Sequence, residues 1–257
     1  PLWRKMLPNH RYQIFKRLRQ ADMMNLLDSL YSKCIQGIPM ISSPIEKMAD
    51  DYLQHNASVE DAAKDMINKQ VIKCTTSGFI TNLGGVITLP VTIPANVGSV
   101  MYVQMRMIAC AAYMAGYDVH TDQVQTLVYA CLAGVSVMEV AKKAGIKIGQ
   151  KGLENLIDKI PGKVLIAINH KVGFRMLTKF GETGAINLGK AIPVVGGVIG
   201  GGFDFIDTKF IGNRAYNQFI KGDFDYGVKE DTKAKGNKNS DIIIDASDSD
   251  NEELKDE

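Results

Sequence analysis

Residues 74–105, CTTSGFITNLGGVITLPVTIPANVGSVMYVQM, decide the fold, because these 32 residues carry no charge. Pro94 suits the first position of a helix. We predict a helix from Pro94 to Gly116 that is apolar on nearly every side, which is typical of a buried core helix or a membrane span. Threonine, serine and asparagine side chains, two prolines and the Gly84-Gly85 pair interrupt the stretch and favour the core helix.

Turn and capping signals divide the chain on either side of this helix. Gly116-Tyr117-Asp118 ends it, and Thr121 can cap the next helix, whose apolar run is Leu127 to Met138. Two apolar helices joined by a short turn form an αα-hairpin. Upstream, Ser58 and Asp61 have the spacing of a capping box and predict another helix start.

A glycine cluster follows Pro193, where we predict a second helix begun by proline. Gly196 and Gly200, and likewise Gly197 and Gly201, are four residues apart and would lie on one helical face. Small residues at this spacing let another backbone approach closely. We expect these four glycines to pack a helix.

These elements predict an all-α fold, a compact multi-helix bundle with a central apolar hairpin and a Gly-rich helix. Residues 1–44 form a basic amphipathic helical region, either a surface helix or one that lies on anionic lipid. Residues 45–221 form the helical domain. Residues 222–257 form an acidic tail whose composition predicts disorder.

The formal net charge of +2 is a cancellation. Residues 1–221 carry 25 basic and 16 acidic side chains, whereas residues 222–257 carry 5 basic and 12 acidic ones. A body of net charge +9 favours an anionic membrane surface. Its Lys and Arg form no single stripe and no reader motif appears, so we expect no nucleic-acid partner.

The sequence offers no metal, cofactor or catalytic constellation. The four cysteines (Cys34, Cys74, Cys110 and Cys131) lack metal-ligand spacing and suggest a reducing, cytoplasmic setting. Asp118, His120 and Asp122 could ligate a metal, but capping of a turn is the simpler interpretation.

Arg106 is the one charge inside the apolar helix. A buried charge without a partner is costly, so Arg106 must pair, line a wet cavity or sit at a rim. Its candidate ion-pair partners are Asp118, Asp122, Asp204 and Asp207. A polar ligand-binding pocket would instead group Asn82, Gln104, Arg106 and Asp118.

The stretch GFITNLGGVITLPVTIPANVGSVMYVQMRMIACAAYMAGYD, with GIKIG and GKAIPVVGGVIGGGFDFIDTKFIGNRA downstream, resembles the EcsC family over about residues 58–219. The resemblance implies a helical domain encoded beside an ABC transporter of the Ecs type, which is a possible partner. It implies no established reaction.

Three functional hypotheses follow. The first is a non-enzymatic, peripherally membrane-associated accessory or lipid-interacting protein, with a membrane-inserted hairpin over 86–117 as its structural alternative. The second is a small-ligand binder or enzyme using the pocket around Arg106. The third is an adaptor that binds a protein partner through the acidic tail, where Asp241-Ile-Ile-Ile-Asp245 could add to a sheet edge.

Overall fold

A computed structural model describes residues 9–75, 95–143, 145, 160–180 and 199–224. Asn82, Gly196, Gly197 and residues 225–257 of the acidic tail lie outside the described residues. The described part contains eight α-helices, one π-helical turn and no strand, which confirms the all-α prediction. The elements are α1 (Asn9–Gln36), α2 (Ile45–Gln54), α3 (Val59–Thr75), α5 (Ala95–Met114), α6 (Asp122–Ala133), α7 (Val137–Lys143), α8 (Gly162–Phe180), α10 (Ile199–Ala215) and η4 (Tyr216–Ile220).

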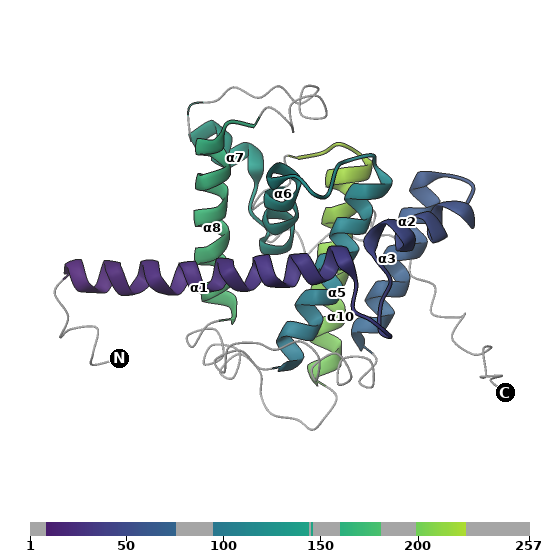
Figure 1. The fold of residues 1–257 in the computed structure, drawn as a ribbon, viewed down its shortest axis with the longest axis horizontal. Coiled ribbons are helices and arrows are strands. Elements are labelled where there is room, and N and C mark those ends of the chain that lie inside the picture. The colour runs from purple at the N-terminus through teal and green to yellow at the C-terminus, as the bar shows by residue number, and fades with distance from the viewer. Residues whose placement is uncertain (1–8, 76–94, 144, 146–159, 181–198, 225–257) are drawn as a thin grey trace.

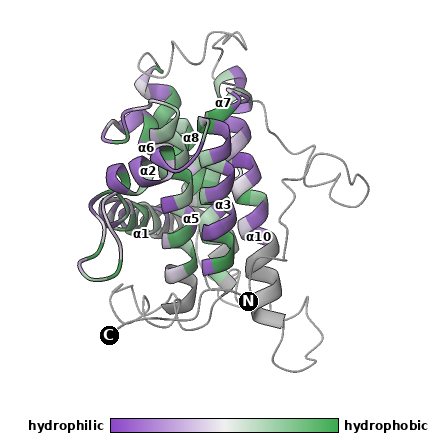
Figure 2. Cartoon of the chain, turned by 90° about the vertical axis from the view of Figure 1, so that its right-hand side faces the viewer, coloured by the Kyte–Doolittle hydropathy of each residue, from purple (hydrophilic) through white to green (hydrophobic). Residues whose placement is uncertain are grey.

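Helix α5 is the centre of the bundle. It packs against α1, α2, α3, α6 and α10, and its hydrophobic residues lie inside the molecule (Figure 2). Met101, Met105 and Ile108 are fully buried, as are most residues from position 98 to 114. The helix predicted from Pro94 to Gly116 is therefore a core helix of the bundle.

No single helix in the described ranges is both long enough and apolar enough to cross a membrane. Helices α6 and α7 together are apolar and long enough, but they meet at 109° across a short break.

Helix α1 runs across the other helices and connects two sides of the bundle (Figure 1). Helix α1 contacts α5 and α8, and Leu27, Leu30 and Cys34 of its C-terminal half are buried. This half belongs to the core, whereas the side chains of its basic segment, residues 11–19, lie outside the described set.

The predicted helix boundaries have the expected local chemistry. The Ser58 hydroxyl accepts a hydrogen bond from the Asp61 amide at 3.1 Å, and Thr121 caps α6 by accepting from the Val124 amide at 3.4 Å. The apolar run predicted from 127 to 138 is divided, because Gly134 at φ 65° ends α6. The Ser136 hydroxyl then accepts from the Glu139 amide and starts α7.

Among the helical glycines whose surroundings are described, Gly212 of α10 packs most closely, and it lies outside the predicted set. A Cβ placed on Gly212 would lie 2.6 Å from Cγ2 of Ile67 in α3. Ile67 is fully buried, so it has little room to move. Gly200 and Gly201 lie in the first turn of α10, among residues whose packing is not described.

Gly212→Ala should therefore destabilise the protein by about 1–3 kcal/mol, since the new methyl group overlaps a well-packed neighbour. Urea unfolding measures the change. Gly173→Ala in α8 is the matched control, because its Cβ would make only an ordinary 3.4 Å contact with the Met24 sulfur. That control should be neutral or gain up to about 1 kcal/mol from helix propensity. Equal stabilities for the two variants would contradict the close approach.

Candidate functional site

Arg106 lies in the middle of α5 with only 4% of its surface exposed. Its Nη1 donates to the Cys34 carbonyl at 2.8 Å, and its Nη2 donates to the Ser43 carbonyl at 2.8 Å. Nη2 also contacts the Met48 sulfur at 3.2 Å. The guanidinium thus ties the core helix to the end of α1 and to the start of α2.

The Cys34 carbonyl is available because α1 ends two residues later. Gly37 has φ 77°, and the amide of Ile38 donates to Ser42 instead of continuing the helix. Carbonyls in the last turn of a helix lack partners and carry partial negative charge. Arg106 satisfies one of these groups, which offsets part of the cost of its own burial.

No carboxylate in the described part of the chain forms an ion pair with Arg106. The predicted partners Asp118, Asp122 and Asp207 are therefore not its partners, and the side chain of Asp204 is outside the described set. A guanidinium has five N–H donors. Three of them are used by the Cys34 carbonyl, the Ser43 carbonyl and the Met48 sulfur. The guanidinium is therefore hydrogen-bonded, but none of these partners carries a negative charge that would neutralise it.

Arg106 forms part of the wall of a cavity of about 480 Å³. The loop after α1 supplies one side, and α2, α3 and α5, which contact one another, supply the rest (Figure 1). The lining residues are Ile41, Ser42, Ser43, Met48, Asp51, Tyr52, His55, Asp65, Lys69, Gln70, Lys73, Tyr102, Val103 and Arg106. The prediction that Arg106 lines a cavity thus has a counterpart in the structure.

Positive charge gathers in this cavity. Burial lowers the pKa of Lys73, and the neighbouring cations Arg106 and Lys69 lower it further. Lys69 is neutralised in part, because its Nζ lies 3.1 Å from the Asp65 carboxylate. Arg106 and Lys69 therefore both repel the charged form of Lys73, and a bound anion would relieve this repulsion.

Gln70 places an unsatisfied donor in the same wall. Its side chain is 3% exposed, and its Nε2 has no hydrogen-bond partner. Gln70 lies close enough to Tyr52 to affect the pKa of its hydroxyl, but the two side chains do not meet the distance and angle limits of a hydrogen bond. Burial raises the pKa of Tyr52 to about 12, so its hydroxyl stays protonated. A buried donor without an acceptor is costly.

The residues predicted to share a pocket do not all come together. Gln104 is buried and donates to the Thr208 hydroxyl at 3.0 Å, which joins α5 to α10. Asp118 accepts from the His120 amide at 2.9 Å, as expected for a capping residue, and lines a different cavity at the other end of α5. Only Arg106 of the described members lines the cavity next to α3.

Gln70 and Lys73 were missed by the sequence interpretation. Lys69 and Lys73 are four residues apart and share one face of α3. That spacing is also typical of an ordinary solvated helix face. Nothing in the sequence marks Gln70 as buried.

The described residues of this cavity hold no nucleophile activated by a base. The Ser42 hydroxyl is bonded to the Tyr102 hydroxyl at 2.7 Å, and the His55 ring is bonded to the Asp51 carbonyl. All four cysteines are free and buried, and burial raises the pKa of Cys110 to about 12. Within the described ranges, no three His, Cys, Asp or Glu side chains are arranged to hold a metal.

Arg106→Met should destabilise the protein by about 2–4 kcal/mol, because the carbonyls of Cys34 and Ser43 would lose their charged donor. Arg106→Lys should recover only part of the loss, since an ammonium cannot reproduce the planar fork that reaches both carbonyls. Equilibrium urea unfolding followed by circular dichroism measures both variants. If Arg106→Met unfolds at the same urea concentration as the wild type, Arg106 does not stabilise the junction between α5, α1 and α2.

The comparisons with known proteins give a family. The model of the EcsC protein family matches residues 44–221, which covers every described helix except α1 and all lining residues of the cavity except Ile41, Ser42 and Ser43. No curated protein and no solved structure matches the chain significantly. Because the family model spans more than half of the sequence, the chain belongs to the EcsC protein family.

Proposed function

We propose that this protein is a non-enzymatic, lipid-interacting protein that associates peripherally with an anionic membrane surface in the cytoplasm. The observation that carries the proposal is an exposed apolar loop tip, Met40, beside a cavity lined by Lys69, Lys73 and Arg106.

Met40 is held outside the protein by its own backbone. Ile38 and Ser42 exchange backbone hydrogen bonds of 3.0 and 2.9 Å across the turn, and Met40 at the tip is fully exposed with φ 63°. A non-glycine residue in this region is strained. An apolar side chain presented in this way suits insertion at the boundary between headgroups and acyl chains.

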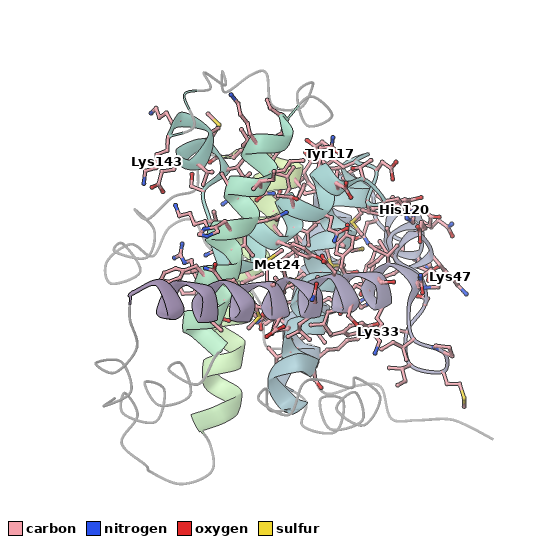
Figure 3. All side chains as sticks on the ribbon, turned by 60° about the vertical axis from the view of Figure 1, so that its left-hand side comes forward. Met24, Lys33, Lys47, Tyr117, His120 and Lys143 are labelled. Carbon is pink, nitrogen blue, oxygen red and sulfur yellow. The ribbon has the colours of Figure 1, made fainter. Side chains whose placement is uncertain are left out.

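A second exposed apolar side chain is Ile72 on α3, which precedes the lining residue Lys73 in the sequence. It is 52% exposed. Lys33 lies in the last turn of α1 and Lys47 in the first turn of α2, the two helices that the Met40 loop joins (Figure 3). Apolar tips surrounded by lysines favour anionic bilayers, to which each nearby cation contributes about 1 kcal/mol.

Two further sequence hypotheses are left as predictions. Partnership with an ABC transporter follows only from the family resemblance. An adaptor role would use the acidic tail, which lies outside the described residues.

Flotation with vesicles of phosphatidylcholine and 30% phosphatidylglycerol tests the proposal. We expect the wild-type chain to float at 0.1 M salt, to float less at 0.5 M salt because exposed charges are screened, and to stay unbound with pure phosphatidylcholine. Met40→Asn should weaken partitioning at least about fivefold, because the apolar contact is lost. Asparagine tolerates the positive φ, so the turn is retained.

Ile166→Asn in α8 is the matched control, since Ile166 is 71% exposed and lies outside the cavity. It should partition like the wild type. Failure of the wild-type chain to bind anionic vesicles, or equal losses for Met40→Asn and Ile166→Asn, would refute the proposed docking surface.

A further inference from the structure

We infer that the cavity between α2, α3 and α5 is a binding site for a phosphate-type oxyanion, held by Gln70 of α3, Lys73 of α3 and Arg106 of α5. If the oxyanion is a lipid headgroup, this inference rests on the proposed function. If the oxyanion is a soluble ligand, the inference is independent of the proposed function.

The three side chains offer hydrogen-bond donors, and two of them, Lys73 and Arg106, have no acceptor atom. Arg106 has two N–H groups beyond the three engaged by described residues. Lys73 carries an ammonium group in the cavity wall, and Gln70 supplies an unpartnered Nε2 although it is 97% buried. An oxyanion with three or more acceptor oxygens satisfies donors that approach from two helices, whereas a carboxylate has only two oxygens.

The remaining charged groups of the cavity are compatible with an anion. Asp65 is paired with Lys69, so it contributes little net charge. His55 is exposed at the margin, with Nδ1 bonded to the Asp51 carbonyl at 2.6 Å. Asp51 is the one lining carboxylate without a described ion pair, and its charge opposes an anion. Its removal should therefore strengthen binding.

Titration of the full chain with inorganic phosphate, followed by calorimetry, tests the site directly. We expect saturable binding with a Kd of about 1 mM or tighter. Gln70→Met keeps the side-chain volume and removes the unpaired donor. It should raise Tm by about 3 °C while it weakens phosphate binding at least about fivefold.

Gln20→Met is the matched control for this variant. Gln20 is also buried with an unpartnered Nε2, but it lies on α1 against α8 and outside the cavity. It should raise Tm similarly and leave the phosphate Kd unchanged. A purely structural role for Gln70 would give both variants the same phosphate affinity.

Charge variants at Lys73 and Asp51, with Lys163 as a control, test whether the electrostatic potential of the cavity is positive. Lys73→Ala should weaken phosphate binding about tenfold, whereas Lys163→Ala, an equal charge loss at the start of α8, should leave it within about twofold. Asp51→Asn should tighten binding about two- to threefold, because a repelling charge is lost.

Vesicles distinguish the two sources of the phosphate group. If the ligand is a lipid headgroup, vesicles with phosphatidic acid bind more tightly than phosphatidylglycerol vesicles of equal charge, and Gln70→Met removes this preference. If the ligand is soluble, phosphate binds but Gln70→Met leaves vesicle binding unchanged. Met40→Asn should weaken only vesicle binding, so its effect separates the docking surface from the oxyanion site.

Absence of saturable binding by the wild-type chain at 10 mM phosphate, on the order of ten times the expected Kd, would overturn the inference. So would wild-type affinity in both Gln70→Met and Lys73→Ala, even if the protein still binds anionic vesicles.

Discussion

The bond between the Arg106 guanidinium and the backbone at the end of α1 is the interaction on which this structure depends. Burying an isolated cation costs several kcal/mol, and a carboxylate would be the usual compensation. Here the compensation comes from the carbonyls of Cys34 and Ser43. Carbonyl dipoles stabilise the cation without cancelling its charge, so α5 is anchored to α1 and α2 while the positive potential persists in the cavity.

The same interaction, an arginine that donates to backbone carbonyls at a helix end, recurs at the end of α6. Arg214 of α10 donates to the Cys131 carbonyl at 2.7 Å, and Arg175 of α8 donates to the Gly134 carbonyl. Each arginine therefore reaches the C-terminal end of a helix other than its own, where the helix dipole favours a cation. These bonds join α6 to α8 and α10, as Arg106 joins α5 to α1. Crossings between helices are fixed by side chain to backbone bonds as well as by apolar packing.

The sequence predicted the elements better than it predicted the contacts between them. The uncharged stretch before Arg106 and the turn at Gly116 located α5, because helix periodicity and capping are local properties. The partners of Arg106 could not be deduced, since a backbone carbonyl is present at every residue and only the fold decides which one is free. Gly212 was overlooked for a related reason: its role depends on the position of Ile67, 145 residues away in the chain.

Gln70 in the cavity wall and Met40 in the neighbouring loop are both energetically unfavourable where they stand. Each has a local cost, an unpartnered buried amide in one case and a positive φ in the other. Methionine at position 70 or asparagine at position 40 would reduce that cost, so neither residue is explained by stability alone. Strained or unsatisfied groups persist where a ligand uses them. Both lie on or beside a single cavity that also holds Lys73 and Arg106. A headgroup bound there would satisfy Gln70 and offset the repulsion around Lys73, while Met40 entered the adjacent apolar layer.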